Sequence, residues 1–356
     1  MAFLLFILIL GLIITVHEYG HFIVARKNGI VVEEFAVGMG PLIYGKKKGD
    51  TLYSIRLLPI GGYCKMLGIE EKSDDEEAFN NKNVFRRMAV IAAGSIFNIV
   101  LSFLLVIIIL SFTGFTSLTV NSVHEDYPAY AAGLQQGDRI VRINGARTYV
   151  FHNVVMALNI GQGQPMDVVV NRGGTPVEMN LTPMQQTNNG SHSYVMGFSA
   201  VSYSGMLATP IENMQRANIF NTLQYGLGTV VHYIRSVVMT LVQLVTFNIQ
   251  LNDLAGPVGI VSIIGDTYDA AIEYSVGVAV LQMMTLAALL SANVALFNLL
   301  PIPALDGGRL IFLIIEAIRG KPISPEKEGM VHVVGFALLI GLIIVVSFND
   351  ILRLFR

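Results

Sequence analysis

The sequence predicts a polytopic α-helical membrane protein with four transmembrane helices, a membrane-associated β-hairpin or small sheet, and one extracytoplasmic α+β domain. Only 13% of the 356 residues are charged, whereas ordinary soluble domains carry about 25%. Hydrophobic residues make up 53% of the chain, and its mean hydropathy is +0.60. Several apolar runs approach the length of about 20 residues that crosses the hydrocarbon core. The net charge of −2 gives no indication of nucleic-acid binding.

Four segments are predicted to cross the bilayer: residues 1–27, 85–113, 281–318 and 329–350. The charged stretch 319–328 separates the last two and is predicted to be a short loop. The first segment lacks the basic start and the small-residue cleavage site of a signal peptide, so we expect it to be an uncleaved span.

Basic residues predict the orientation of these spans. The stretch from Arg26 to Arg87 carries eleven Lys and Arg residues, and the loop 319–328 carries three more. Lys and Arg concentrate in cytoplasmic loops. Both loops are therefore expected in the cytoplasm, with both chain ends and the region between the second and third spans outside it.

The first cytoplasmic region, residues 28–84, is predicted to contain β-structure. Val31–Gly40 and Thr51–Met66 alternate in polarity, are rich in β-forming residues and are interrupted by glycines, which is typical of a hairpin. Lys72–Asn83 is polar and acidic and is predicted to be a solvated linker. Cys64 is the sole cysteine, which excludes an internal disulfide framework and a cysteine-based metal site.

Residues 114–186 differ in composition and predict a compact module outside the membrane. Asn144-Gly145 is a strong signal for a hairpin turn, and two further strand patterns follow it. Residues 187–280 are expected to form an extracytoplasmic linker and a helix. That helix, within 213–247, has polar residues spread through an apolar background and is predicted to lie on the membrane surface. A fifth span at this position is the alternative.

The first span contains the motif His-Glu-Tyr-Gly-His at residues 17–21. On a helix, His17 and His21 lie one turn apart on the same face, so both imidazoles can reach one ion, and Glu18 lies beside them to take a proton from a metal-bound water. Each ionisable residue costs at least about 2.5 kcal/mol near the bilayer centre, which favours a bound ion. The alternative is a pair of histidines satisfied by neighbouring helices.

A catalytic zinc usually has three protein ligands and a water, and Asp306 is the candidate for the third. It lies in Asn-Leu-Leu-Pro-Ile-Pro-Ala-Leu-Asp-Gly-Gly at residues 298–308. The prolines and glycines must interrupt the helix, which is tolerated at membrane depth only within protein or beside a wet cavity. The alternative is an Asp that caps the helix by accepting from the amides of Gly308 or Arg309.

These motifs, with Gly-Ser-Ile-Phe-Asn at 94–98 in the second span, resemble the site-2 protease family of intramembrane zinc peptidases over nearly the whole chain. The order is similar to the bacterial regulator-of-sigma-E protease branch. The resemblance implies one Zn²⁺ ion bound by His17, His21 and Asp306, with Glu18 as the catalytic base. It implies substrate-binding roles for Asn298 and, with less definition, for Asn98. A packing role for Gly94 and Asn98 stays open.

The resemblance extends to the regions between the spans. Gly61 and Gly62 match the family's β-structured loop, where a strand edge would pair with an unwound substrate; a purely structural hairpin is the alternative. Ala131–Asp138 matches a PDZ signature, so the 114–186 module is expected to be a PDZ-like domain that binds a peptide or substrate segment. Leu254–Ile260 matches a family segment to which we assign a structural or gating role.

The implied function is zinc-dependent proteolysis of single-span membrane proteins after a first cleavage outside the membrane. By resemblance these substrates are anti-sigma factors and remnant signal peptides, and the location is a bacterial inner or plasma membrane with the active site towards the cytoplasm. Well-known Gram-negative members carry two PDZ modules, and the single module here favours a Gram-positive-like relative. Two other classes stay open: a PDZ-bearing scaffold with a structural zinc, and a transporter with broken helices. The oligomeric state is also open.

Overall fold

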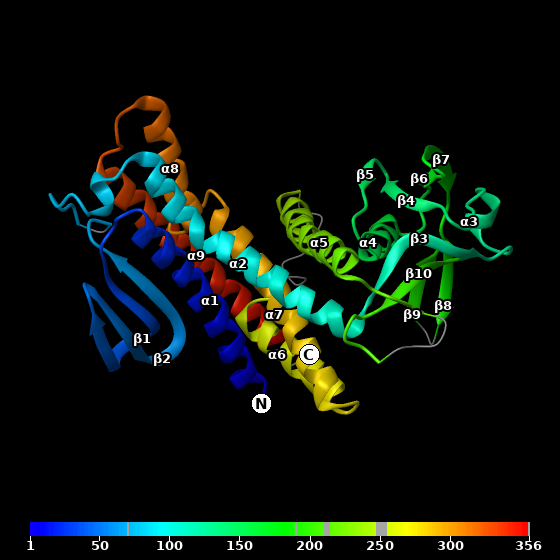
Figure 1. Cartoon of the computed structure of the whole chain (residues 1–356), viewed down its shortest axis with the longest axis horizontal. Coiled ribbons are helices and arrows are strands. Elements are labelled where there is room, and N and C mark those ends of the chain that lie inside the picture. Colours follow the sequence, from blue (N-terminus) through cyan, green and yellow to red (C-terminus); the bar gives the residue numbers. More distant parts are fainter. Residues whose placement is uncertain (70, 189–190, 210–213, 247–254, 355–356) are drawn as a thin grey trace. The chain divides into compact units, whose positions relative to one another are not determined.

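A computed structural model describes residues 1–69, 71–188, 191–209, 214–246 and 255–354 (Figure 1). The chain divides into two compact units. The first unit comprises Met1–Leu105 and Ser236–Arg356, and the second comprises Val106–Arg235. Helices α2 and α5 each run from one unit into the other.

The first unit is a helical bundle with a β-hairpin beside it (Figure 1). Its core includes Ile9 and Ile13 of α1, which pack against Ile264 of α6 and Met283 of α7. Because these side chains recur at helical spacing, each helix turns one apolar stripe towards its neighbours. The helices are α1 (Ala2–Lys27), α2 (Val84–Thr113), α5 (Ile219–Val245), α6 (Pro257–Ile272), α7 (Val276–Leu299), α8 (Asp306–Arg319) and α9 (Pro325–Leu354).

The described residues contain five helices that are long and apolar enough to cross a membrane. They are Ala2–Lys27, Val84–Thr113, Ile219–Leu244, Val276–Leu299 and Glu328–Arg353. The chain is therefore a multi-pass membrane protein. Four of these helices coincide with the predicted spans, and Ile219–Leu244 is the segment that the sequence predicted to lie on the surface.

The third predicted span is interrupted where its prolines lie. Helix α7 ends at Leu299, and α8 begins at Asp306 after six residues outside either helix. Proline lacks the N–H that a continuing helix requires. The glycines after Asp306 let the chain fold back tightly, since a Cβ on Gly307 would lie 2.1 Å from the carbonyl oxygen of Leu300. The break therefore places Asp306 at the start of a new helix.

Helix α6 differs from the prediction for residues 187–280, which treated this stretch as extracytoplasmic linker. Residues 257–272 form a helix that packs against α1, α7 and α9 in the first unit. Asp350 of α9, which is 3% exposed, accepts a hydrogen bond from the backbone N–H of Gly259 at 2.8 Å. A Cβ on Gly256 would lie 2.8 Å from the Asp350 carboxylate. The described part of the Leu254–Ile260 motif thus joins α6 to α9; Leu254 lies outside the described residues.

The predicted hairpin consists of β1 (Val32–Lys48) and β2 (Thr51–Met66), which pair antiparallel and bend strongly. Phe35 pairs with both Tyr53 and Cys64, so the first half of β1 lies between the two halves of β2. Residues 62–66 form the edge of this sheet, and β2 also contacts α1.

The second unit is built on a seven-stranded sheet with the order β11-β10-β3-β4-β6-β7, and β5 pairs with β4. Its core includes Val120, Ile140, Met166 and Val170, each at most 1% exposed. Strands β8 and β9 form a separate hairpin. The elements are β3 (Phe115–Val123), α3 (Pro128–Ala131), β4 (Arg139–Ile143), β5 (Ala146–Arg147), α4 (Phe151–Gly161), β6 (Met166–Arg172), β7 (Thr175–Leu181), β8 (Met184–Asn188), β9 (Ser191–Val195), β10 (Phe198–Ser204) and β11 (Gln215–Arg216).

This unit extends beyond residue 186, where the sequence predicted that the module ends. Strand β10 pairs antiparallel with β3, for example Phe198 with Val123. Strands that are so far apart in the chain leave no local sequence pattern that indicates their pairing. The adjacent strands β6 and β7, in contrast, were predicted from the turn between them.

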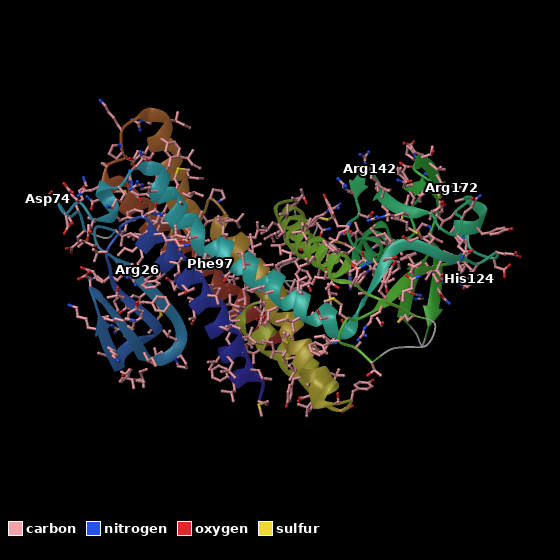
Figure 2. All side chains as sticks on the ribbon, in the orientation of Figure 1. Arg26, Asp74, Phe97, His124, Arg142 and Arg172 are labelled. Carbon is pink, nitrogen blue, oxygen red and sulfur yellow. The ribbon has the colours of Figure 1, made fainter. Side chains whose placement is uncertain are left out.

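A buried ion pair stabilises the second unit. Asp138 is 1% exposed and accepts hydrogen bonds from Arg172 Nε at 2.8 Å and from the backbone N–H of Gln135 at 2.9 Å. Arg172 lies at the end of β6 (Figure 2). Its hydrogen bonds hold the pKa of Asp138 below the ordinary value. This contribution to stability is therefore present above about pH 3.9, the unfolded value, and is lost as the pH falls through the lower folded pKa.

We expect Asp138→Ala to lower the free energy of unfolding of this unit by about 1–3 kcal/mol, because it removes charge-assisted hydrogen bonds. Hydrogen exchange of the β4 and β6 amides, measured on the full-length protein at pH 7, checks this result. The matched control is Asp167→Ala, which removes an exposed carboxylate from the same sheet. Equal exchange in the two variants would contradict the prediction.

Candidate metal centre

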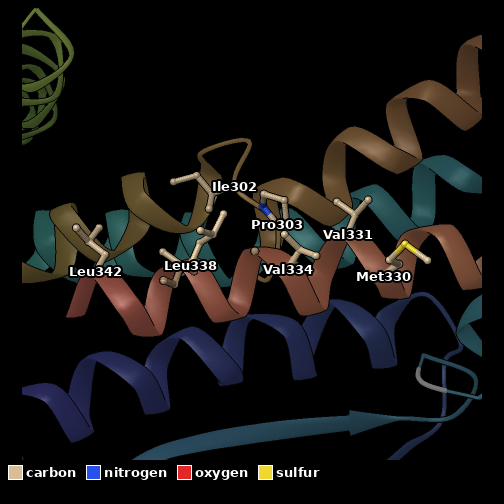
Figure 3. A pocket seen from close by; sticks show the side chains of 9 residues that line it. Ile302, Pro303, Met330, Val331, Val334, Leu338 and Leu342 are labelled. Carbon is tan, nitrogen blue, oxygen red and sulfur yellow. The ribbon is translucent and has the colours of Figure 1, made fainter. Parts of the chain in front are cut away.

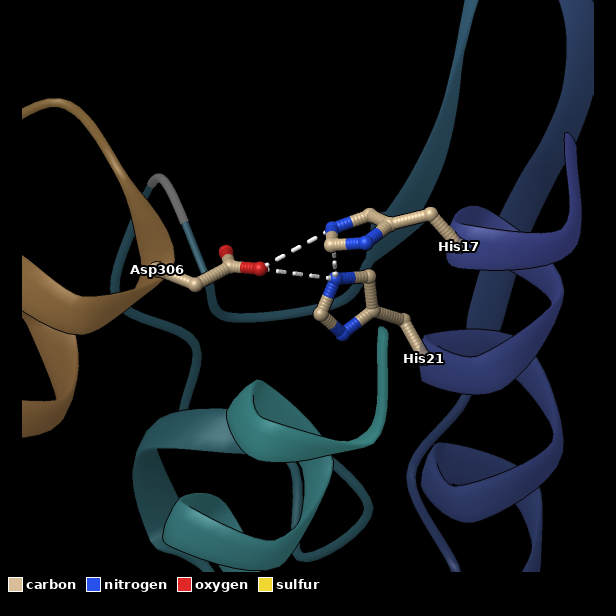
Figure 4. Close-up of side chains that lie close together, drawn as sticks. All are labelled: His17, His21 and Asp306. Atoms are coloured by element: carbon tan, nitrogen blue, oxygen red, sulfur yellow. Dashed lines mark hydrogen bonds and ion pairs between the residues drawn. The ribbon is translucent and has the colours of Figure 1, made fainter. Parts of the chain in front are cut away.

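Two distant segments bring together three side chains that could hold a metal ion in the first unit. His17 and His21 lie on the buried face of α1 and are 7% and 6% exposed. Asp306 is the first residue of α8, and its side chain is 21% exposed. Its Oδ2 lies 3.0 Å from His17 Nε2 and 3.2 Å from His21 Nε2, and the two Nε2 atoms are 3.2 Å apart (Figure 4).

These separations fit one small divalent cation. Ligand atoms bound about 2.0–2.1 Å from a tetrahedral zinc lie about 3.3–3.4 Å from one another. The observed triangle, with sides of 3.0–3.2 Å, is close to one face of such a tetrahedron. Two imidazole nitrogens and a carboxylate oxygen also match the donors of catalytic zinc sites, which leave the fourth position for water or substrate.

The outer nitrogen of each imidazole lies beside a polar atom of α2. His21 Nδ1 is 2.8 Å from the carbonyl oxygen of Val90, which can only accept a hydrogen bond. The proton is therefore on Nδ1, and the lone pair of Nε2 points into the triangle. His17 Nδ1 lies 3.4 Å from Nδ2 of Asn98, which is 0% exposed. Asn98, predicted to contact substrate, is thus fully buried beside a histidine.

Gly94 of α2 leaves room for the centre. A Cβ at this position would lie 2.5 Å from His21 Nε2 and 2.6 Å from His17 Nε2, so any side chain here displaces the imidazoles. The Gly-Ser-Ile-Phe-Asn motif of the second span therefore has both its ends, Gly94 and Asn98, against the histidines.

We expect Gly94→Ala to reduce bound zinc and to lower turnover by about 100-fold, because misplacing reacting groups by about 1 Å has an effect of this size. Zinc content per chain and cleavage rate check the result. Gly341→Ala in α9 is the control, since its added methyl meets no atom within 4 Å. Full zinc occupancy in Gly94→Ala would contradict the prediction, because it would show that the imidazoles can accommodate a methyl group at this position.

Asp306 does not act as a helix cap. The backbone N–H groups of Gly308 and Arg309 both donate to the carbonyl oxygen of Leu305, at 3.1 and 3.4 Å, and the first turn of α8 has no side-chain cap. The carboxylate of Asp306 is instead turned towards the two histidines (Figure 4). The capping alternative for Asp306 is therefore excluded.

Glu18 lies next to the centre and against the edge of the hairpin. A Cβ on Gly62 would lie 3.6 Å from Glu18 Cγ. Gly61, in contrast, has a positive φ of 91° and faces Met39. The edge strand 62–66 therefore runs directly beside Glu18.

The remaining predicted site residue, Asn298, lies half-buried in the last turn of α7, just before the break that leads to Asp306. The structure does not place its side chain in the triangle of donors.

Sequence reasoning missed the contact of α9 with the loop that carries Asp306. Nδ1 of His332 accepts a hydrogen bond from the backbone N–H of Ala304 at 2.8 Å, and Ala304 has a left-handed φ of 76°. A Cβ on Gly335 would lie 2.3 Å from Pro303. The same loop and α9 line an apolar groove of about 360 Å³ (Figure 3). An ionisable residue within an apolar helix is the signal by which the sequence could have indicated His332.

Comparisons with known proteins agree with this chemistry. Residues 5–342 match the model of Peptidase family M50. A protein of Clostridium acetobutylicum named as a zinc metalloprotease is 36% identical over 345 residues, covering 97% of this chain and 96% of that protein. The zinc metalloprotease RasP of Geobacillus kaustophilus is 31% identical, covering 98% and 97%. The regulator of sigma-W protease RasP of Bacillus subtilis is 30% identical, covering 98% of both.

Proposed function

The chain belongs to peptidase family M50, the site-2 proteases, and is a zinc metalloendopeptidase; on this premise we propose that it cleaves single-span membrane proteins within the bilayer, at a zinc held by His17, His21 and Asp306. The observation that carries the proposal is the triangle of donors at 3.0–3.2 Å, contributed by two segments far apart in the chain. A tetrahedral ion held by these three donors would keep its fourth position for water or substrate.

Glu18 acts as the general base in this proposal. Zinc, when bound, supplies Lewis acidity that lowers the pKa of a ligated water towards about 7 and polarises the scissile carbonyl. Glu18 follows His17 on α1 and takes the proton from the attacking water, then passes it to the leaving nitrogen. Its side chain lies against the hairpin edge at Gly62, where a Cβ would be 3.6 Å from Glu18 Cγ. His21 keeps the lone pair of its Nε2 directed at the ion, because its Nδ1–H donates to the carbonyl oxygen of Val90.

The substrate is extended along the edge strand of the hairpin. A helical peptide bond is shielded by its own hydrogen bonds, so the substrate must unwind before hydrolysis. Residues 62–66 pair with β1 on one side only and lie beside Glu18 on the other, which supports strand addition at this edge. Gly61 and Gly62 lie where this edge begins and are assigned to substrate binding together with it, and Asn298 holds the substrate backbone near the break before α8.

Four spans cross the membrane in this proposal: α1, α2, α7 with its continuation into α8, and α9. Helix α5 lies on the membrane surface. The first half of α5, which belongs to the second unit, makes polar contacts within that unit. A helix surrounded by lipid would not make such contacts. The hydroxyl of Tyr225 accepts from the backbone N–H of Phe151 at 3.3 Å, His232 lies 3.0 Å from Asn153, and Arg235 donates to the carbonyl oxygen of Arg147 at 2.7 Å.

The metal centre lies towards the cytoplasmic side, with the chain ends and the second unit outside. His21 is five residues from Arg26, within the basic stretch that marks the cytoplasmic face. We place the chain in a bacterial inner or plasma membrane, because it has long apolar helices and the relatives named above are bacterial proteins.

The second unit is proposed to be a single PDZ domain that binds an extended peptide or substrate segment. Supporting this, the PDZ-like signature leads from α3 into β4, with Asp138 buried at the junction. Phe198 of β10 faces Phe151 of α4, with ring centroids 6.2 Å apart. We place the peptide between β10 and α4, where it adds to the sheet through backbone hydrogen bonds.

Anti-sigma factors and remnant signal peptides are the proposed substrates, after a first cleavage has removed their outer parts. The name of the Bacillus subtilis relative, regulator of sigma-W protease, supports the first of these classes.

Cleavage by the full-length protein tests the proposal. The purified protein is reconstituted with single-span proteins that carry either a short or a bulky outer domain, with and without a zinc chelator. We expect fragments cut within the span of the short form, their loss with the chelator, and their return with added Zn²⁺. Cleavage that persists with the chelator, or that occurs only outside the span, would refute the proposed function.

A further inference from the structure

The environment of Asn98 differs from that of a substrate-binding residue. It lies on the buried face of α2, with an exposed fraction of 0%. Its own backbone carbonyl accepts a hydrogen bond from Ser291 Oγ of α7 at 2.8 Å. Its side chain lies 3.4 Å from His17 Nδ1, on the side of the imidazole that faces away from Asp306. The His17 ring thus lies between Asn98 and the carboxylate of Asp306.

One polar atom of the buried Asn98 amide has no hydrogen-bond partner among the described residues. Asn98 Oδ1 makes no hydrogen bond among the described residues, while Nδ2 points at His17 Nδ1. The oxygen and nitrogen of an amide have nearly the same shape, so their assignment follows from the hydrogen bonds that they make. Exchanging the two atoms places Oδ1 beside Nδ1, where it accepts a hydrogen bond from Nδ1–H.

The exchanged orientation selects the tautomer that a metal needs. With its proton on Nδ1, His17 carries its lone pair on Nε2, which is the atom 3.0 Å from Asp306 Oδ2. His21 already has this arrangement, because the carbonyl oxygen of Val90 accepts from its Nδ1. Both histidines then have an outer acceptor on α2, one supplied by the backbone and the other by a side chain. Outer acceptors of this kind fix the orientation and raise the basicity of ligand imidazoles.

We propose that Asn98 is a positioning residue for His17, which accepts a hydrogen bond from Nδ1–H and thereby presents Nε2 to the zinc. This inference rests on the proposed zinc site and replaces the substrate-binding role that the sequence predicted for Asn98. In the second-span motif, Gly94 then leaves space for the two imidazoles, and Asn98 orients the imidazole of His17.

Three variants of the full-length protein test the inference, with zinc affinity measured by competition against a chromophoric chelator, and with kcat and KM measured separately. Asn98→Leu keeps the branching at Cγ and removes the acceptor, so we expect zinc affinity to fall about 10–100-fold. Asn98→Asp keeps an acceptor oxygen, and its affinity should stay within about threefold of the wild type. Ser102→Ala alters the same buried face of α2 one turn away and should match the wild type.

Each outcome separates the inference from its rivals. Failure of the wild-type protein to bind zinc would refute the proposed function itself. If the wild type binds zinc and Asn98→Leu binds it equally well with a raised KM, Asn98 contacts the substrate and the inference is wrong. Equal loss in Asn98→Leu and Asn98→Asp would exclude the acceptor role, and equal loss in Ser102→Ala would show a packing effect. Weak zinc binding in Asn98→Leu alone, with reduced kcat, supports the positioning role.

Discussion

Replacing Glu18 by Gln is expected to lower turnover by about 10²–10⁴-fold, the contribution of a positioned general base, while zinc stays bound. Gln keeps the length and shape of the side chain, but it does not take up a proton. Zinc binding should persist because Glu18 lies outside the triangle of donors. Cleavage of a reconstituted single-span substrate and elemental analysis of the same preparation check both halves of this result.

The control for this variant is Glu76→Gln, which neutralises an exposed glutamate of the polar linker and should cleave at the wild-type rate. Two results would count against the role of Glu18. Undiminished cleavage by Glu18→Gln would mean that another group removes the proton. Loss of zinc from Glu18→Gln would mean that Glu18 contributes to metal binding and is not the base that takes a proton from the attacking water.

The part of the centre that the sequence predicted depends on local spacing. His17 and His21 lie on one face of α1 because residues four apart in a helix are neighbours, and no other segment is needed to bring them together. The break before Asp306 was also visible, since Pro301 and Pro303 interrupt an apolar helix. These are short-range consequences of backbone geometry, and the helices and the hairpin that follow from them are present in the structure.

What the sequence did not show depends on packing between distant segments. The direction of the Asp306 carboxylate was left open, because both a helix cap and a metal ligand fit the local pattern. In the structure the amides of Gly308 and Arg309 donate to the carbonyl oxygen of Leu305 and not to Asp306. Gly94 carries no local sign that its missing side chain makes room for two imidazoles. The closure of the second unit by β10 depends on pairing with β3 across about 80 residues, and such non-local pairings leave no periodic pattern.

The position of α6 shows the same limit in the helical unit. At 16 residues it is too short for a predicted span, so composition placed it in a linker. The buried carboxylate of Asp350, which accepts from Gly259, gives the reason for the glycines of this segment. Only the folded bundle shows that Gly256 and Gly259 pack against Asp350 of α9.

Replacing Asp306 by Ala is expected to remove zinc and, with it, all measurable cleavage. The substitution leaves two donors on one helix, and loss of a direct ligand should exceed the roughly 100-fold upper cost of losing an outer partner. Helix α8 should still form, because Leu305 and not Asp306 satisfies its first amides. The control is Asp269→Ala, which removes an exposed carboxylate of α6. Zinc content and turnover are measured together; an Asp306→Ala protein that retained both would show that the ion, and the reaction, depend on other residues.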